Sequence, residues 1–588
     1  MWKRTHNCGE LNKSQIGIEV KLNGWVNTVR LHGQVIFVDL RDRYGKTQLV
    51  FNSNDYQGDF EAVKKLSMED VLSIIGTVRP RASQAVNTSM KTGEIEVIVS
   101  RLEILSETEP LPFIVTDRNS AEEELRLKYR YLELRTEELQ HNLLLRHRTY
   151  QAVRSCLADN GFVEIETPML MKSTPEGARD YLVPSRIHQG RFYALPQSPQ
   201  IYKQVLMIAG MDRYFQIVKC FRDEDLRSDR QPEFTQIDLE MSFVDEEDVQ
   251  EVVEGLTRKV FKRVLNQDLP AEFPQMSWKQ AMDLYGTDKP DTRYEMLLQD
   301  IDRFTSRSTF KGFKGVSAVK GLVVQGGSKY SRKDIDQLQE LVRKYKAGGL
   351  AWMKRNNGEF NGGISKFFNT DLLEEMAVEL NVSDGDIIFI VAGERRIVQT
   401  SLGSLRTEIA HREGFVHSGK FKPLWIYEYP LFEYEEEAER YVSMHHPFTA
   451  PRVEDEELLD SDPLAARSRG YDLVINGYEV AGGSIRIHTS EMQEKIFRLL
   501  GLTPEDAHTK FGFLVEALKY GAPPHGGIAF GFDRLIMLLA GTDNIRDVIA
   551  FPKTTSATSL MDNAPSEVSE QQLNELGIQI IKKSKSKT

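Results

Sequence analysis

Two strand-like segments separated by a charged loop limit the possible folds of this chain. Residues 214–221 and 233–243 alternate apolar and polar side chains, as strands with one buried face do. The loop between them, 222–232, contains three arginines and four acidic residues and is too polar to be buried. These segments predict an antiparallel hairpin whose loop presents cations to an anionic ligand.

Alternation in the second strand separates a core face from a polar face. The even-numbered residues 234–240 share one side, because every second residue of a strand points the same way, and the odd-numbered residues 235–241 then face a core. The polar side carries an aromatic ring and carboxylates beside the loop arginines, which suits a nucleotide triphosphate and an amino acid. The alternative is an amphipathic hairpin with a solvated charged face.

The loop sequence resembles a known motif. It contains Phe-Arg-Asp-Glu at 221–224 and Arg-Gln-Pro-Glu-Phe-Thr-Gln-Ile-Asp at 230–238, which resemble motif 2 of the class II aminoacyl-tRNA synthetases. The surrounding sequence is similar to bacterial-type aspartyl-tRNA synthetases, of subclass IIb, over nearly the whole chain. Residues 162–168 resemble motif 1, a helix-strand-proline element of the dimer, and residues 526–534 resemble motif 3.

Bulk properties exclude several classes of protein. A chain of 588 residues is too long for one core, so we expect three or four domains. No run approaches the ~18 apolar residues of a membrane span, and the N-terminus lacks the apolar stretch of a signal peptide, so we expect a cytoplasmic protein without membrane contact. A net charge of −12 means that any RNA binding must use local basic patches. Three scattered cysteines indicate neither a disulfide framework nor a cysteine zinc site.

The expected fold class is multidomain α+β. Residues 1–107 contain five short strands that suit a small closed barrel. They are similar to the OB-fold anticodon-binding domain of aspartate, asparagine and lysine synthetases. The other expected segments are a linker at 108–140, an antiparallel-sheet catalytic domain at 141–287 (motifs 1 and 2), an inserted α/β domain of the GAD type at 288–419, the rest of the catalytic domain at 420–562 (motif 3), and a C-terminal extension at 563–588.

Residues on the predicted barrel are candidates for tRNA recognition. The resemblance implies that Arg30, Phe37 and Gln48 contact the anticodon, by cation contact and by base stacking. Without the resemblance, Phe37 reads as a core residue of an apolar alternating strand. His32, beside Arg30, lies in the loop where relaxed recognition of tRNA(Asn) could arise.

A second hairpin supplies candidate metal and substrate ligands. Residues 469–488 read as two strands around an Asn-Gly turn at 476–477, the strongest short-range hairpin signal in the chain. Asp472 and Glu479 lie on either side of the turn, and carboxylates near a triphosphate are oxygen ligands for Mg²⁺. Arg486 then offers a bidentate fork to an aspartate carboxylate. The alternative is an exposed hairpin with ordinary surface charges.

The resemblance also implies a set of aspartate-binding residues. Lys203 is chemically reasonable there, because a buried anionic side chain needs a nearby cation. Lys203 and Arg486 around one carboxylate leave too much positive charge for asparagine. His445, with His446 beside it, is expected to link aspartate affinity to pH, and a zinc site there lacks partner ligands. The implied set is Glu176, Ser198, Gln200, Lys203, Arg222, Asp238, His445, His446 and Arg486.

The ATP site follows from motifs 2 and 3. The resemblance implies that Arg222 holds the α-phosphate and Arg534 the γ-phosphate, while adenine stacks between Phe234 and Arg534. The implied catalytic residues are Arg222, Glu224 and Arg534. The implied ATP-binding residues are Arg222, Asp223, Glu224, Gln231, Phe234, Glu479, Gly531, Phe532, Asp533 and Arg534. The expected metal is Mg²⁺, at Asp472 and Glu479, with no zinc.

The implied activity is that of an aspartate–tRNA ligase. ATP would activate L-aspartate to aspartyl-adenylate with release of pyrophosphate, and the aspartyl group would pass to the 3′ end of tRNA(Asp), with tRNA(Asn) as a second candidate. A homodimer through the motif 1 region is expected. Two alternatives stay open: a relative that passes aspartyl-adenylate to ammonia without tRNA, and a binding protein with an inactive catalytic fold.

Overall fold

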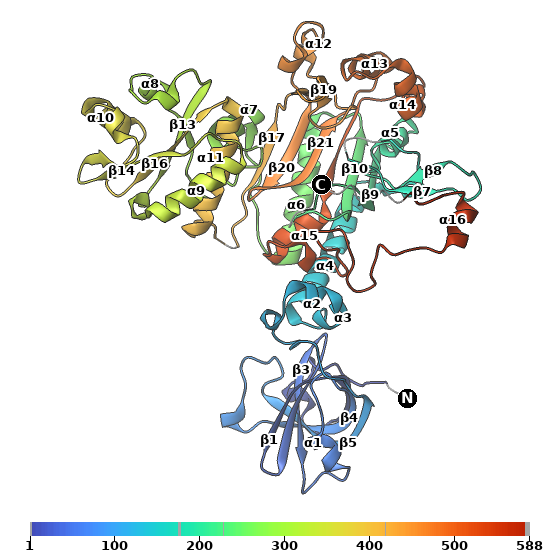
Figure 1. Cartoon of the computed structure of the whole chain (residues 1–588). Coiled ribbons are helices and arrows are strands. Elements are labelled where there is room, and N and C mark those ends of the chain that lie inside the picture. Colours follow the sequence, from blue (N-terminus) through green and yellow to red (C-terminus); the bar gives the residue numbers. More distant parts are fainter. Residues whose placement is uncertain (1–2, 175–177, 227–228, 418, 582–588) are drawn as a thin grey trace. The chain divides into compact units, whose positions relative to one another are not determined.

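The computed structural model describes residues 3–174, 178–226, 229–417 and 419–581. The chain divides into two compact units (Figure 1). One comprises Met1–Leu144 with Ala550–Ser566, and the other comprises Leu145–Ile549 with Glu567–Thr588. The finer segment boundaries expected from the sequence stay predictions.

The first unit contains a closed five-stranded barrel with the strand order β1-β2-β3-β5-β4. Alternate apolar residues such as Val20, Leu22 and Val26 fill its interior, since every second side chain of a strand points inward. This confirms the predicted barrel. Its elements are β1 (Glu19–His32), β2 (Val35–Asp42), β3 (Gly45–Asn52), α1 (Phe60–Lys64), β4 (Val71–Pro80) and β5 (Ile95–Ser106), followed by α2 (Glu123–Lys128) and α3 (Arg130–Glu133).

The second unit is built on an eight-stranded sheet with the order β11-β17-β20-β21-β22-β10-β9-β6. All neighbouring strands are antiparallel except the two edge pairs, β11 with β17 and β6 with β9. The strands between these two edge strands are therefore antiparallel to one another, as predicted. Its strands are β6 (Val163–Glu164), β9 (Arg213–Phe221), β10 (Glu233–Ser242), β11 (Gln275–Ser277), β17 (Pro423–Tyr427), β20 (Gly470–Ile475), β21 (Tyr478–Ile485) and β22 (His525–Gly531).

Three helices bury one face of this sheet. Val153 of α4 (Glu137–Asp159), Val253 of α6 (Glu246–Leu265) and Ile536 of α15 (Phe532–Ala540) share a core with Ile237 of β10 and other odd-numbered residues of that strand. The even-numbered side chains of β10 consequently lie on the opposite face, which is free to form a site.

A second, five-stranded sheet has the order β12-β13-β16-β14-β15. In its central strand β16, Ile387, Phe389 and Val391 join one core, whereas Ile388 and Ile390 join another. Both faces are therefore covered by helices, which gives the expected mixed α/β insertion. Its elements are β12 (Leu298–Asp300), α8 (Asp302–Thr305), β13 (Ala318–Val324), α9 (Arg332–Lys344), β14 (Ala351–Asn356), β15 (Glu359–Asn361), α10 (Thr370–Glu379), β16 (Ile387–Gly393) and α11 (Arg395–Arg412).

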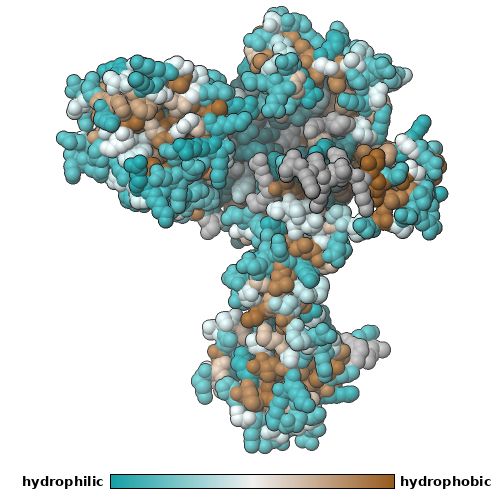
Figure 2. All heavy atoms as spheres, viewed as in Figure 1, coloured by the Kyte–Doolittle hydropathy of each residue, from teal (hydrophilic) through white to brown (hydrophobic). Residues whose placement is uncertain are grey.

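Short elements complete the second unit. They are β7 (Leu182–Pro184) and β8 (Phe192–Ala194), α5 (Gln200–Ile208), α7 (Trp278–Tyr285), β18 (Phe432–Glu435) and β19 (Arg440–Ser443), α12 (Leu458–Ser461), α13 (Ser490–Leu499), α14 (Pro504–Leu518) and α16 (Glu570–Leu576). The surface over the inserted sheet is mainly hydrophilic on the face shown in Figure 2. Within the described part of the chain, every helix is too short or too polar to cross a bilayer.

Candidate active site

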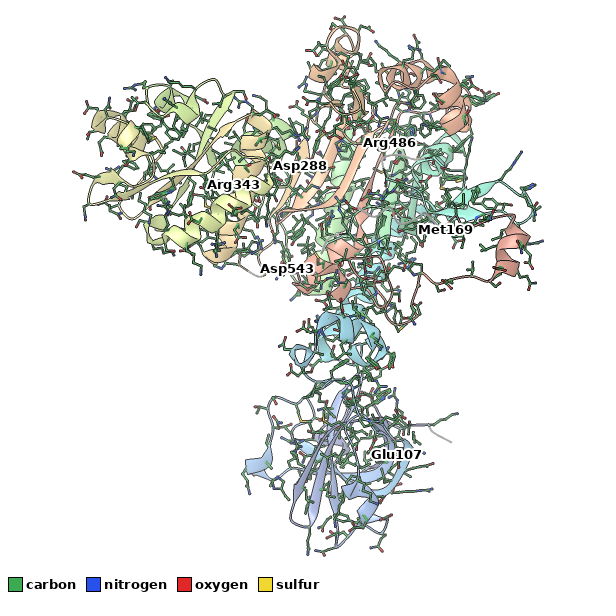
Figure 3. The ribbon with its side chains drawn as sticks, in the orientation of Figure 1. Glu107, Met169, Asp288, Arg343, Arg486 and Asp543 are labelled. Carbon is green, nitrogen blue, oxygen red and sulfur yellow. The ribbon has the colours of Figure 1, made fainter. Side chains whose placement is uncertain are left out.

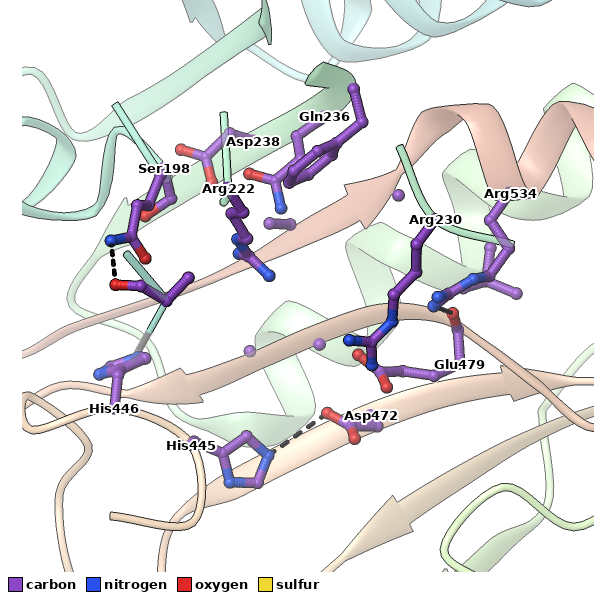
Figure 4. A pocket seen from close by; sticks show the side chains of 18 of the residues that line it. Ser198, Arg222, Arg230, Gln236, Asp238, His445, His446, Asp472, Glu479 and Arg534 are labelled. Atoms are coloured by element: carbon purple, nitrogen blue, oxygen red, sulfur yellow. Dashed lines mark hydrogen bonds and ion pairs between the residues drawn. The ribbon is translucent and has the colours of Figure 1, made fainter. Parts of the chain in front are cut away.

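A cavity of about 550 Å³ lies on the sheet face opposite the helices (Figure 4). Strands β10, β20, β21 and β22, helix α5 and the loop after β9 all contribute side chains to it. The structure thus brings together predicted residues from distant parts of the sequence. Those that line the cavity are Ser198, Gln200, Lys203, Arg222, Glu224, Gln231, Phe234, Asp238, His445, His446, Asp472, Glu479, Arg486, Gly531, Asp533 and Arg534.

One end of the cavity contains a buried lysine between two carboxylates. Lys203 Nζ lies 2.8 Å from Asp238 Oδ1 and 3.2 Å from Glu240 Oε2, and all three side chains are at most 2% exposed. Burial raises the pKa of Asp238 to about 6, against the lowering effect of Lys203. Asp238 Oδ2 is buried and accepts no hydrogen bond from the described residues. This oxygen is therefore an acceptor available to a ligand.

Arg486 does not offer the expected open fork. Its Nε and Nη2 donate to the two oxygens of Glu240 at 2.9 and 3.1 Å, and its Nη1 donates to His446 Nε2 and Ser484 Oγ, both at 2.6 Å. These bonds use four of the five N–H groups of an arginine. Glu240 occupies the Nε–Nη2 edge of the guanidinium, so a bidentate contact from Arg486 to a substrate carboxylate stays a prediction.

The charge argument for aspartate changes accordingly. Lys203 and Arg486 were expected to carry uncompensated positive charge, but Asp238 and Glu240 pair with them. Ionised, these four groups sum to zero. A preference for aspartate over asparagine must then come from the positions of the Lys203 and Arg486 charges rather than from a net positive charge of the site.

The adjacent histidines have different environments. His446 accepts a hydrogen bond from Arg486, and its pKa lies well below 6.5, first because of burial and then because of the Arg486 charge. His445 Nε2 lies 3.4 Å from Asp472 Oδ1. His446 is consequently neutral near pH 7. Any change of protonation in the cavity near that pH must therefore take place on another group.

We expect His445, and not His446, to control the pH dependence of aspartate affinity. A protonated His445 adds positive charge to the cavity, so wild-type affinity for aspartate should fall as the pH rises. The His446→Gln variant should keep this slope, because the pKa of His446 is already well below its usual value, and His445→Ala should lose it. Aspartate affinity measured against pH for the three proteins checks this, and an unchanged slope in His445→Ala contradicts it.

Two carboxylates face the cavity where magnesium was expected. Asp472 Oδ1 and Glu479 Oε1 both lie near Gly482, where an added Cβ would stand 2.7 and 3.6 Å from them. Glu479 has its pKa lowered to about 2: burial alone would raise it, but Lys289, 2.6 Å away, and Arg534 more than offset this. No group of three or more His, Cys, Asp or Glu able to hold a metal occurs among the described residues. Two oxygen ligands suit a magnesium ion that keeps waters and also binds phosphates.

Arginines gather at the other end of the cavity. The Arg222 guanidinium lies 5.1 Å from the centre of the Phe234 ring. Arg534 donates to the Glu479 carbonyl at 2.6 Å and to Asp229 Oδ2 at 3.1 Å, while its buried Nε has no partner among the described residues. Arg230 pairs with Glu224 at 3.0 Å. This end can bind a polyanion if the acidic partners give way.

Two predicted ATP-binding residues do not line the cavity. Phe532 is 0% exposed and stacks on Tyr150, with ring centres 4.3 Å apart, so it is a packing residue of the core. Asp223 lies 3.5 Å from Arg179. Asp533, which follows Phe532, does line the cavity, but its carboxylate already accepts hydrogen bonds from Thr235 N and Arg146 Nη1 at 2.7 and 2.5 Å. Glu176 lies outside the described residues.

The four predicted anticodon residues share one outer face of the barrel. Arg30 pairs in register with Phe37 and donates to Gln48 Oε1 at 3.2 Å. The rings of His32 and Phe37 meet edge to face at 6.0 Å. Phe37 is only half-buried, while its neighbours Ile36 and Val38 fill the core, so it faces outward rather than inward.

Family models match nearly the whole chain. Residues 122–555 match the model described as tRNA synthetases class II (D, K and N), and residues 20–105 match the OB-fold nucleic acid binding domain. This chain belongs to the class II aminoacyl-tRNA synthetases. It is therefore a ligase, and its two described units contain the family's OB-fold and catalytic domain.

Full-length relatives are similar to this synthetase. It is 55% identical to an aspartate–tRNA(Asp/Asn) ligase of Oleidesulfovibrio alaskensis, over 99% of this chain and 96% of the relative. It is 51% identical to an aspartate–tRNA ligase of Staphylococcus carnosus, over 99% and 100%. An asparaginyl-tRNA synthetase structure from Pyrococcus horikoshii, in complex with asparaginyl-adenylate, shares the fold with a TM-score of 0.59 at 20% identity, over 94% of this chain and 99% of that one.

Sequence reasoning missed several residues of the synthetase cavity. Tyr429 donates from its hydroxyl to Asp472 Oδ2 at 2.8 Å, and Lys289 pairs with Glu479. Glu240 was assigned to the polar face, but not as the partner of Arg486. No periodic pattern marks Lys289, which lies in a loop. Only the three-dimensional fold brings it to the site.

Proposed function

We propose that this synthetase is an aspartate–tRNA ligase that forms aspartyl-adenylate from L-aspartate and ATP and then charges tRNA(Asp). Full-length relatives at 51–55% identity bear that name, which supports the proposal. The observation that carries it is the cavity itself, because one end contains two fixed cations, Lys203 and Arg486, and the other contains Arg222 and Arg534. We place the reaction in the cytoplasm.

The amino-acid end is suited to a short diacid. The unpaired Asp238 Oδ2 can accept the substrate ammonium group, while Lys203 and the remaining N–H of Arg486 face a side-chain carboxylate. Asparagine offers no charge to these cations. Lysine would place a third cation among them, at a cost in Coulomb energy.

The chemistry is positioning and electrostatic stabilisation. The aspartate α-carboxylate attacks the α-phosphorus of ATP and pyrophosphate leaves, so two anions must meet while charge accumulates on phosphoryl oxygens. Arg222 stabilises the α-phosphate and Arg534 the γ-phosphate. Magnesium, when bound, offsets phosphate charge, and Asp472 and Glu479 would hold it.

The 3′-terminal ribose hydroxyl of tRNA then attacks the aspartyl carbonyl and AMP leaves, and we assign no protein base to this step.

The proposed tRNA contacts lie on the outer barrel face of Arg30, His32, Phe37 and Gln48. A half-buried aromatic beside a guanidinium suits base stacking with phosphate contact. The motif 1 region is proposed as the dimer contact, since Val163 of the short edge strand β6 is 50% exposed.

Charging assays with purified tRNA(Asp) and tRNA(Asn) test the proposal. We expect aspartate to be attached to tRNA(Asp), and also to tRNA(Asn), as in the names of several relatives. Charging of tRNA(Asp) rejects both an inactive fold and an enzyme that passes aspartyl-adenylate to ammonia. Absence of any charging contradicts the proposal, and charging of tRNA(Asp) alone contradicts its second part.

A further inference from the structure

The loop between α7 and β12 brings a lysine to the proposed magnesium ligand. Lys289 Nζ lies 2.6 Å from Glu479 Oε2, and the two side chains, which line the cavity, are 37% and 33% exposed. In the view of Figure 3, Asp288 of this loop lies between Arg343 in α9 and Arg486 just after β21. The contact therefore joins the start of the inserted region to the catalytic sheet.

The inserted domain fixes this loop. Arg406 of α11 is 1% exposed and donates to the carbonyl oxygens of Asp291, Tyr294 and Met296 at 2.9, 2.9 and 2.8 Å. Three charge-assisted bonds from one buried side chain leave the loop backbone little freedom. Lys289 is consequently presented by a fixed backbone rather than by a free surface turn.

Close backbone contacts hold the beginning of the loop as well. A Cβ on Gly286 would lie 2.1 Å from the carbonyl oxygen of Gln399 in α11, and one on Gly403 would lie 2.5 Å from the Gly286 oxygen. On the other side, a Cβ on Gly477, in the Asn-Gly turn that precedes Glu479, would touch Asp291 at 3.3 Å. Helix α11 and the catalytic hairpin thus enclose the loop.

An ammonium group and a divalent cation cannot share this carboxylate without cost. Magnesium ligands lie at about 2.0–2.1 Å, so a metal on either oxygen of Glu479 would stand within a few Å of Lys289 Nζ. Like charges at such a separation repel strongly in a partly buried site. We propose that Lys289 is a positioning residue that competes with a divalent cation for Glu479 and holds this carboxylate in place until the metal arrives. The inference rests on the proposed function, which makes Glu479 a metal ligand.

Binding of Mn²⁺ to the free enzyme tests the competition, because Mn²⁺ shares the preference of Mg²⁺ for oxygen ligands. The decrease of the free-ion electron paramagnetic resonance signal gives the Kd without ATP, aspartate or tRNA. Lys289→Met should lower this Kd about tenfold, the effect of removing one charge from a close, partly buried pair. Lys289→Arg should keep the wild-type Kd, because it keeps the charge. Lys289→Gln repeats the measurement with a neutral side chain that can still donate to Glu479.

Two controls separate competition from a structural effect. Glu479→Gln and the double variant with Lys289→Met should have the same Kd, because without the carboxylate there is nothing to compete for. Lys279→Met removes a lysine of α7 that is 86% exposed and should change nothing. Equal, weaker or undetectable Mn²⁺ binding by both Lys289→Met and Lys289→Gln overturns the inference. Failure of wild-type enzyme to charge tRNA bears on the proposed function alone, since no reaction takes place in the Mn²⁺ measurement.

Discussion

Replacing Arg222 with alanine is expected to lower aspartate-dependent ATP–pyrophosphate exchange by about 10²- to 10³-fold, the usual cost of losing one transition-state donor. Arg222 follows β9, lines the cavity and lies against the Phe234 ring, at the end of the cavity where we propose that the nucleotide binds. Because charge on the α-phosphate grows only as the bond forms, most of the loss should appear in kcat. Exchange rates at varied ATP and aspartate concentrations give the measurement.

The matched control for Arg222 lies in the preceding strand. Lys219 of β9 is exposed and does not line the cavity, so Lys219→Ala should leave exchange unchanged. A general loss of folding in the Arg222 variant would lower the signal of its thermal unfolding transition, whereas loss of a single donor would not. Near-normal exchange by Arg222→Ala would remove this residue from the catalytic step.

Local patterns predicted much of the scaffold. The two-residue alternation of β10 correctly predicted Phe234, Gln236 and Asp238 on the cavity face and Ile237, Leu239 and Met241 in the core, whereas Thr235, predicted to face the core, also lines the cavity. The Asn-Gly turn between β20 and β21 has both residues at positive φ, 55° and 86°, which suits the predicted hairpin. Such features depend on neighbours in sequence, so one sequence suffices to find them.

Long-range pairings within the site could not be predicted in the same way. Glu240 and Arg486 are 246 residues apart in the sequence, and no spacing rule predicts that the Glu240 carboxylate pairs with the Arg486 guanidinium. Phe532 shows a different difficulty, because consecutive helix residues point about 100° apart. Gly531, Asp533 and Arg534 of this motif line the cavity, but the ring of Phe532, at the start of α15, packs against Tyr150 instead.

The second large effect is expected from Arg486→Lys, which keeps the charge but removes the planar fork. Glu240 is 0% exposed, and its two bonds to Arg486 fix both groups beside Lys203. One ammonium cannot replace the bonds to Glu240, His446 and Ser484 together, and removing one partner of a buried charged pair costs about 2–5 kcal/mol. We expect the KM for aspartate in pyrophosphate exchange to rise about 10²- to 10³-fold, with the preference over asparagine reduced and the KM for ATP little changed.

A second arginine–glutamate fork in the same unit provides the control for Arg486→Lys. Arg469, just before β20, donates from Nε to Glu246 at 2.8 Å and from Nη2 to the other oxygen, but it does not line the cavity. Arg469→Lys loses the same kind of fork from a more exposed pair, so it should cost less stability than Arg486→Lys, while the KM for aspartate stays at the wild-type value. If Arg486→Lys binds aspartate as Arg469→Lys does, the buried fork serves only to hold the sheet together. If aspartate binding weakens in Arg486→Lys alone, substrate selectivity depends on the Arg486 guanidinium, which the buried Glu240 holds in position.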